Sequence, residues 1–167
     1  MVWNRIIAYI DLSDGRVVQK PIPKEMRTLY LGGRGVDMYL LYNHLKPKIN
    51  PLSSENVLLI GAGLLVGIPC LGAGRCDIAA RSPLTGAVGD SNIGGFFAHE
   101  LRLAGFDHLV ISGKARKPVY IWINDGEISV EDASHLWGKD TFETQTLIRD
   151  DLGDQDIKSL VIGVAGE

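Results

Sequence analysis

The sequence predicts an α+β fold, in which mixed and antiparallel β-sheets are combined with a few helices. The chain has 167 residues, of which 46% are hydrophobic and 22% are charged, and these values suit one domain with a sizeable core. Short apolar runs alternate with turn residues along most of the chain, whereas only three or four segments have helical character. This excess of short strands favours α+β over a regular alternation of strands and helices.

The first part of the chain is predicted to form a hairpin followed by helices. Residues 5–12 and 16–22 are apolar runs separated by Ser-Asp-Gly, which is a turn sequence. A short helical turn is expected at 24–29. Residues 36–45 have apolar side chains at roughly helical spacing, so a helix is predicted there, and two prolines close behind it mark its end.

The middle of the chain is predicted to contain two buried strands, a helix and a third strand. NVLLIGAG (56–63) is a continuous apolar run, and RCDIAARS (75–82) alternates weakly between apolar and polar residues. Residues 94–103 place apolar side chains on one face of a helix. FDHLVISG (106–113) is again an apolar run of strand length.

The last third is predicted to add a hairpin, a capped helix and a final strand. The strands at 118–125 and 127–132 are joined by Asp-Gly, a typical hairpin turn. A helix is expected at 141–151, because Asp140 is a good N-cap and a glutamate follows it three residues later, which is the pattern of a capping box. IKSLVIG (157–163) is predicted to be the last strand.

Composition excludes several classes of function. The net charge of −3 provides no basic field for nucleic acid, and no run of about 18 apolar residues predicts a membrane span. The two cysteines, Cys70 and Cys76, have a spacing that matches no zinc pair, redox motif or iron–sulfur ladder. The N-terminus lacks the features of a signal peptide, so a cytoplasmic protein is expected. No histidine pairs at metal-ligand spacing, and His135 is expected to hydrogen-bond within its own turn.

GAGLLVG (61–67) follows an apolar strand and has the spacing of a dinucleotide-binding loop. That motif requires a helix to begin in the loop, but a proline and two glycines follow within two turns and break any helix there. The glycines are therefore interpreted as structural turns. Arg34 is also assigned a structural role, because a positive charge at a helix N-terminus opposes the helix dipole unless it is paired elsewhere.

The candidate binding residues lie in the glycine-rich stretch from 72 to 95. Arg75 follows Gly-Ala-Gly at the start of a strand, where its guanidinium suits a phosphate; the alternative is a surface arginine paired with a carboxylate. Asn92 precedes Ile-Gly-Gly and a helix-like segment. It is either a simple N-cap or part of an anion site at the helix N-terminus, with Gly94 keeping that site open.

Several motifs together resemble the N-terminal domain of the tungsten-containing aldehyde:ferredoxin oxidoreductase family. They cover nearly the whole chain in family-like order, and the strongest combination is SPLTG, then SN-x-GG, then DASHLWGKDT. The resemblance implies an N-terminal cofactor-cradling domain, truncated at its C-terminal end, so that residues 1–167 form a single and incomplete domain. The later helical domains of the family are then absent from this chain.

The resemblance also implies the ligands. The family's matching residues bind a bis-pyranopterin tungsten cofactor, which assigns Arg75, Asn92 and Gly94 to cofactor binding; molybdenum replaces tungsten less often. A magnesium ion bridges the pterin phosphates and is held partly by backbone carbonyls, which assigns the carbonyl of Asn92 to magnesium. A 4Fe-4S cluster is expected in the absent domains.

The expected activity of the whole enzyme is oxidation of aldehydes to carboxylic acids, with electrons passed through the iron–sulfur cluster to ferredoxin. No catalytic residue is expected in this chain, which should be inactive alone. The expected partners are ferredoxin and the aldehyde substrate, with no nucleic acid and no membrane. Self-association into a homo-oligomer is expected from exposed apolar surface and an unpaired sheet edge. The alternatives are a family branch with another substrate, such as an aromatic-ring reductase component, and a stand-alone pterin- or phosphate-binding scaffold.

Overall fold

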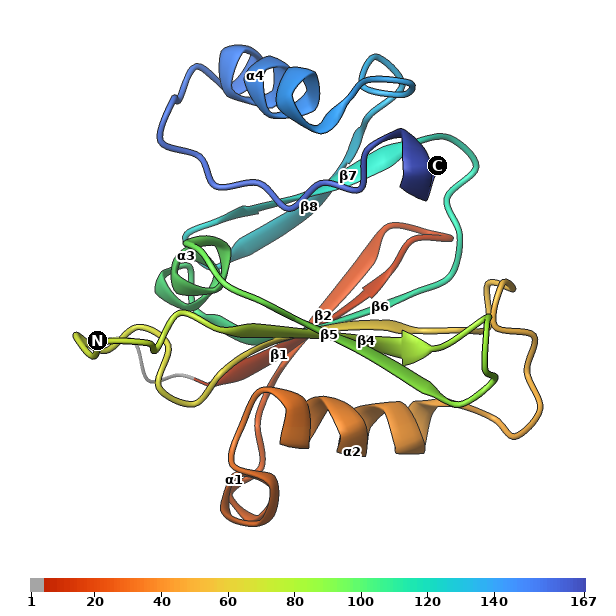
Figure 1. The fold of residues 1–167 in the computed structure, drawn as a ribbon, viewed down its shortest axis with the longest axis vertical. Coiled ribbons are helices and arrows are strands. Elements are labelled where there is room, and N and C mark those ends of the chain that lie inside the picture. The colour runs from red at the N-terminus through yellow and green to blue at the C-terminus, as the bar shows by residue number, and fades with distance from the viewer. Residues whose placement is uncertain (1–4) are drawn as a thin grey trace.

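The structure is a computed structural model that describes residues 5–167. Over this range the chain forms eight strands, four α-helices and a short 3-10 turn (Figure 1). In chain order the elements are β1 (Ile6–Asp11), β2 (Arg16–Pro21), α1 (Lys24–Tyr30), α2 (Arg34–His44), β3 (Leu58–Ala62), β4 (Cys76–Arg81), β5 (Val88–Ile93), α3 (Phe97–Leu103), β6 (Phe106–Ser112), β7 (Val119–Asn124), β8 (Glu127–Asp132), α4 (Thr141–Leu152) and η1 (Val164–Gly166).

Six of the strands form one mixed sheet in the order β2-β1-β6-β3-β4-β5. The β1–β6 pair is parallel, and the other four pairs are antiparallel. Strands β7 and β8 form a separate antiparallel hairpin. The predicted α+β class is therefore confirmed. None of the helices within residues 5–167 has the length and apolar character needed to cross a membrane.

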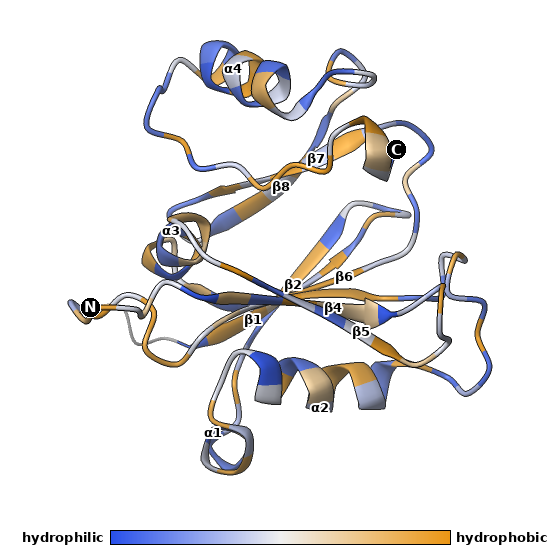
Figure 2. Cartoon of the chain, in the orientation of Figure 1, coloured by the Kyte–Doolittle hydropathy of each residue, from blue (hydrophilic) through white to orange (hydrophobic). Residues whose placement is uncertain are grey.

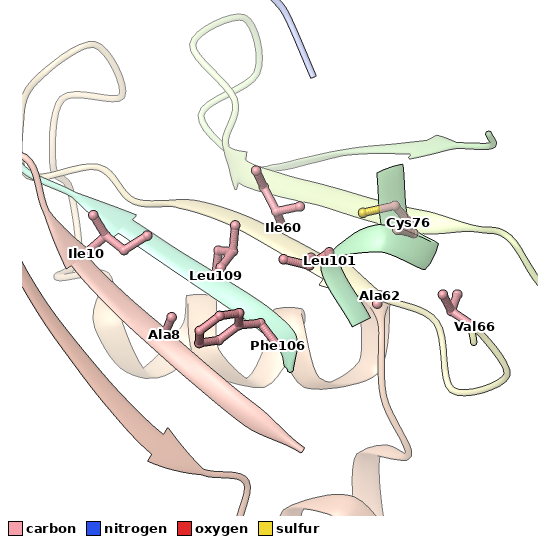
Figure 3. Close-up of a cluster of buried hydrophobic side chains, with 10 residues drawn as sticks. Ala8, Ile10, Ile60, Ala62, Val66, Cys76, Leu101, Phe106 and Leu109 are labelled. Carbon is pink, nitrogen blue, oxygen red and sulfur yellow. The ribbon is translucent and has the colours of Figure 1, made fainter. Parts of the chain in front are cut away.

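The helices lie on opposite faces of the six-stranded sheet (Figure 1). Helix α2 covers one face, while α3 and the β7–β8 hairpin lie on the other, with α4 beyond the hairpin. Because successive strand residues point to opposite faces, each central strand contributes to two cores: Ile7 of β1 packs on the α2 side and Ala8 on the α3 side. Figure 3 shows the α3-side core, which contains Ala8, Ile10, Ile60, Ala62, Val66, Cys76, Leu101, Phe106 and Leu109.

Three local predictions were wrong. Strand β5 was not predicted, because its sequence Val-Gly-Asp-Ser-Asn-Ile is mostly polar and it is the exposed edge of the sheet. The predicted helix at 94–103 begins only at Phe97, because Gly95 has a φ of +97°, which a right-handed helix does not allow. Residues 157–163 are partly hydrophobic (orange in Figure 2) but pair with no described strand, so they do not form the predicted strand.

The predicted capping box of α4 is confirmed. The Asp140 side chain accepts hydrogen bonds from the backbone N–H groups of Phe142 and Glu143, both at 2.8 Å, and the Glu143 side chain accepts from the backbone of Asp140. The helix ends at Gly153 in the left-handed conformation, as a C-terminal glycine permits. Local sequence signals therefore define both ends of this helix.

Helix α2 approaches the sheet most closely at Gly61 of β3. A β-carbon at this glycine would overlap the carboxylate of Asp37, which is fully buried on the inner side of α2. In the sheet Gly61 lies between Asp77 of β4 and His108 of β6, so the missing side chain leaves room for Asp37 between these two residues. The glycine is thus required by close packing, and not by an unusual φ.

We predict that Gly61→Ala destabilises the protein by about 1–3 kcal/mol, because the added methyl group must displace the Asp37 carboxylate from a closed site. A double-mutant cycle measured by urea unfolding tests this origin. In an Asp37→Ala background, Gly61→Ala should cost less than about 0.5 kcal/mol, because the obstructing carboxylate is gone. An equal cost in both backgrounds would contradict the explanation.

Candidate cofactor site

The candidate residues Arg75 and Gly94 lie at the adjacent ends of β4 and β5. In this antiparallel pair Cys76 is opposite Ile93 and Asp77 is opposite Asn92. Extending the register by one residue places Arg75 opposite Gly94. Residues two apart in a strand project from the same face, so Arg75 shares a face with Asp77 and with its partner Asn92. The structure therefore brings the three sequence-predicted residues together at one corner of the sheet.

The side chain of Arg75 extends over Gly94. A β-carbon built on Gly94 would lie 3.9 Å from both Cζ and Nη1 of the arginine. Within residues 5–167 no carboxylate lies within 4.0 Å of this guanidinium, and the residue is exposed. The structure therefore excludes the alternative in which Arg75 is a surface arginine paired with a carboxylate of the described residues. An open guanidinium beside bare backbone suits a planar oxyanion such as phosphate.

Asn92 does not cap a helix. It belongs to β5, is exposed, and is followed by Gly94 and Gly95 before α3 begins. The N-cap of α3 is Phe96, which makes no side-chain cap hydrogen bond, and the helix has only seven residues. The alternative that Asn92 is a simple N-cap is therefore excluded, and the prediction that Gly94 lies at a helix N-terminus was wrong. The site is instead built from the end of an edge strand, whose outer backbone groups are not used by another strand within the described residues.

Glycines bring a second pair of segments together beside this corner. A β-carbon on Gly74 would lie 3.2 Å from the carbonyl oxygen of Gly95, so the loop before β4 nearly touches the segment before α3. A hollow of about 430 Å³ lies next to this contact and includes Cys70, Phe96 and His99 in its wall. Gly74 and Gly95 line this hollow, and each is the chain neighbour of a candidate residue, Arg75 or Gly94.

Arg34 joins helix α2 to the edge strand. Its Nη2 atom lies 2.8 Å from Oδ1 of Asp90 in β5. The structural role predicted for Arg34 is consistent with this pair, because Asp90 supplies the partner that a cation at a helix N-terminus needs. The pair is partly exposed, so it contributes at most about 1 kcal/mol, and its main effect is to fix α2 relative to β5.

Sequence reasoning missed a buried polar cluster beneath the site, formed by Asp37, Asp77 and His108. Their exposed fractions are 0%, 2% and 0%. The Nδ1 atom of His108 lies 2.7 Å from Oδ1 of Asp37. The other Asp37 oxygen, both Asp77 oxygens and Nε2 of His108 have no partner when both carboxyls are ionised. A proton on one carboxyl allows the hydrogen bond between the two aspartates that their positions support.

The electrostatics of this cluster favour that proton. Burial, together with the negative charges of Asp37 and Asp90, raises the pKa of Asp77 to about 6. Burial also raises the pKa of Asp37, although the hydrogen bond and charge of His108 oppose this. Two carboxyls in one buried site cannot both ionise without cost. The cluster therefore takes up a proton at a pH well above the usual range of an aspartate.

We predict that stability falls as the pH rises through the Asp77 transition. The folded pKa of about 6 exceeds the ordinary value of 3.8, so between these values the folded state binds more protons than the unfolded state. The contribution is complete below pH 4 and is lost by pH 6 to 7, amounting to at most about 3 kcal/mol. Asp77→Asn keeps a donor toward Asp37 and cannot ionise.

Urea unfolding of cofactor-free protein between pH 4 and pH 7 measures this effect. The free energy of unfolding of Asp77→Asn minus that of the wild type should increase with pH across the window, because titrating groups that do not interact with Asp77 cancel in the difference. A difference that does not change with pH would show that Asp77 titrates normally.

Other features of the described residues lie elsewhere or are chemically inert. A cavity of about 500 Å³ lies between the sheet, α3 and the β7–β8 hairpin, and its walls are mainly apolar. Burial raises the pKa of the Cys76 thiol to about 12, so it is a poor source of a metal-binding thiolate. His135 contacts Asp151 of α4 at 2.7 Å, so its predicted bond within its own turn was wrong. Among residues 5–167 no group of three His, Cys, Asp or Glu side chains is placed to hold a metal.

The loop after β3 is not a dinucleotide-binding loop. No helix begins in GAGLLVG, and β3 pairs with β4 in an antiparallel manner, whereas the dinucleotide fold requires parallel strands. The prediction of structural turns is confirmed at Gly67, which has a φ of +86°.

Comparison with known proteins decides the family. Residues 7–167 match the family model described as the aldehyde ferredoxin oxidoreductase N-terminal domain. The chain belongs to this family. The tungsten-containing aldehyde ferredoxin oxidoreductase of Pyrococcus furiosus is 44% identical over 99% of this chain, and the match spans 27% of that protein. The chain therefore corresponds to about a quarter of the length of such relatives.

Two other relatives show how widely the family's chemistry varies. The aliphatic sulfonate oxidoreductase, WOR-like subunit, of Pyrococcus furiosus is 31% identical over 89% of this chain and 24% of its own length. The solved BamBC active-site complex of benzoyl coenzyme A reductase, in complex with 1,5-dienoyl-CoA, contains a chain that superposes with a TM-score of 0.90. That chain is 35% identical, with 93% of this chain and 24% of the other covered. Family membership thus identifies the domain without fixing a substrate.

Proposed function

We propose that this chain holds one side of a bis-pyranopterin tungsten cofactor in an enzyme that oxidises aldehydes to carboxylic acids. The observation that carries the proposal is the Arg75 guanidinium, which has no carboxylate partner within the described residues and extends over the bare α-carbon of Gly94. A surface arginine without a role is usually solvated or paired, whereas this one is set against backbone that no side chain covers. An anionic ligand suits that arrangement.

The residues present fit such a cofactor. Arg75 can donate two parallel hydrogen bonds to a pterin phosphate. Gly94 allows the flat pterin to approach the backbone, and Asn92 offers an exposed amide from the neighbouring position on the edge strand. When bound, the tungsten and its dithiolene sulfurs supply the redox chemistry. The chain's own residues bind and orient the group.

Magnesium is proposed to bind through the backbone carbonyl of Asn92. Magnesium prefers oxygen ligands and retains several waters, so one carbonyl and two phosphates are suitable ligands. The edge position of β5 leaves backbone groups available for this contact.

The acid and base groups of the reaction are proposed to lie outside this chain. Asp37 of α2 and Asp77 of β4 are buried beneath the site and face each other and His108, and Asp90 of β5 is paired with Arg34. A general acid or base must come within hydrogen-bonding reach of the substrate. A 4Fe-4S cluster and the contact with ferredoxin are likewise proposed for the rest of the enzyme.

Aldehyde oxidation is favoured because the aldehyde-oxidising relative shares 44% identity over nearly the whole chain. A second candidate is a role in an aromatic-ring reductase, which the TM-score of 0.90 with the benzoyl coenzyme A reductase complex supports. Assays of the full-length protein separate them. Reduction of ferredoxin in the presence of aldehydes supports the first, and activity only with an aromatic coenzyme A thioester supports the second.

We predict that Gly94→Val lowers the tungsten and pterin content of the purified full-length protein more than about tenfold, equivalent to about 1.4 kcal/mol of binding. The branched side chain would fill the space under the Arg75 guanidinium. Gly94 does not have a positive φ, so the fold should tolerate the change. Metal analysis, pterin fluorescence after oxidation, and thermal unfolding provide the measurements.

Gly94→Ala is the matched control. Its methyl group would make an ordinary contact at 3.9 Å, so its cofactor content should fall less than that of the valine variant. A valine variant with normal tungsten and pterin content would place the cofactor elsewhere.

A further inference from the structure

Arg102 of α3 is a buried cation that contacts the loop leading to the candidate site. Its side chain is 3% exposed. Its Nη1 atom donates to the carbonyl oxygen of Gly63 at 3.0 Å and to that of Leu64 at 3.3 Å. Burying a guanidinium is costly unless its N–H groups find partners, so these contacts constrain where the loop can lie.

A bulge in β6 supplies the counter-ion. The register between β1 and β6 shifts between Ile6 and Ile7, which leaves Asp107 as the extra residue. The Oδ1 atom of Asp107 lies 3.4 Å from Arg102 and 3.4 Å from Arg5, and both arginines are largely buried. The bulge thus directs one carboxylate toward two cations, and it anchors Arg102 to the centre of the sheet.

Gly63 links Arg102 to the backbone of Arg75 through two hydrogen bonds. The carbonyl of Gly63 accepts from Arg102, while its N–H donates to the carbonyl oxygen of Arg75 at 3.0 Å. The stem of Arg102 also fills the space beside Gly67, where a β-carbon would lie 3.4 Å from Cγ of the arginine. The backbone of Arg75 is therefore two hydrogen bonds away from the Arg102 guanidinium.

The same arginine belongs to the helix that follows Gly94. Only Gly95 and Phe96 separate Gly94 from the start of α3. Arg102 therefore connects the two segments that carry Arg75 and Gly94, from the side of the sheet opposite α2. A change in this connection would alter the spacing of the two segments without removing any group that faces the ligand.

We propose that Arg102 is a positioning residue that sets the distance between Arg75 and Gly94 through its bonds to Gly63 and Leu64. Its relevance to the cofactor rests on the proposed function, but its effect on the loop does not. The guanidinium acts by its reach, since its Nη1 atom contacts the carbonyls of Gly63 and Leu64 and Oδ1 of Asp107. A lysine at this position keeps the charge, but its ammonium nitrogen is one bond closer to the main chain than Nη1 and cannot occupy the same point between these three oxygens.

The test compares Arg102→Lys and Arg102→Met with Leu101→Ala in the full-length protein. Leu101 is an equally buried neighbour on α3 whose truncation weakens the core but removes no hydrogen bond to the carbonyls of Gly63 and Leu64. Hydrogen exchange of the cofactor-free protein is measured by mass spectrometry for peptides spanning 63–75. Each variant is measured at the same number of degrees below its own melting temperature. Loss of tungsten and pterin from the loaded protein is followed during dialysis.

Both Arg102 variants should accelerate exchange in 63–75 by roughly ten- to a hundredfold, the range expected for losing hydrogen bonds from a charged group. They should also lose cofactor faster than the wild type, whereas Leu101→Ala should match the wild type in both measurements. Normal exchange in Arg102→Lys, or equal effects of Leu101→Ala, would overturn the proposal. A wild-type protein that binds no tungsten or pterin would instead refute the proposed function, while the exchange data would still decide the role of Arg102.

Discussion

The candidate site depends on one constraint, which is the close approach of two backbone segments that lie about twenty residues apart in sequence. The loop before β4 and the segment before α3 come so close at Gly74 and Gly95 that a β-carbon on Gly74 would lie 3.2 Å from the Gly95 carbonyl. Side chains at these positions would separate the segments. Because both are glycine, Arg75 can lie over Gly94, and the end of β5 stays uncovered. The fold thus uses glycine here to bring backbone together.

Buried polar groups stabilise this corner from both sides of the sheet. On the α2 side, Asp37 occupies the space left by Gly61 and contacts His108, with Asp77 beside it. On the α3 side, Arg102 binds the loop after β3. The rest of each core is aliphatic or aromatic, so the polar interior is confined to the strand ends that lead to the site. Polar contacts are directional, and they fix positions that apolar packing alone would leave less defined.

Local signals in the sequence were sufficient for much of the fold. The first hairpin, the β7–β8 hairpin and the cap of α4 each depend on residues within a few positions, and all three were predicted. Strand β5 was missed because an edge strand needs no apolar alternation; its partner β4 and its place at the edge define it. The helix after Gly94 was begun too early because the apolar spacing of its side chains does not reveal a positive φ at Gly95.

The residues of the candidate site also divide into those that the sequence could predict and those that only the fold brings together. Arg75, Asn92 and Gly94 were predicted because a family resemblance implied them, and because glycine-rich sequence beside an arginine suggests an anion site. His108 and Asp37 are 71 residues apart, and Arg102 and Gly63 are 39 apart, so no local pattern connects either pair. From the sequence alone, Arg102 would be expected to be a solvated residue on a short helix. In the structure its side chain is buried beneath the loop after β3.

The contrast between partnered and unpartnered charges indicates what this domain contributes. Arg5, Arg34 and Arg102 each have a carboxylate partner, and each of these pairs joins elements that are distant in sequence. Arg75 is one of several arginines that have no carboxylate partner among residues 5–167, and its guanidinium extends over bare backbone while its carbonyl is held by the loop. A main chain that is fixed during folding lowers the ordering cost of binding, and the cost that remains is that of ordering the Arg75 side chain when a ligand arrives. This arrangement supports the proposal that this corner of the sheet receives an anionic group.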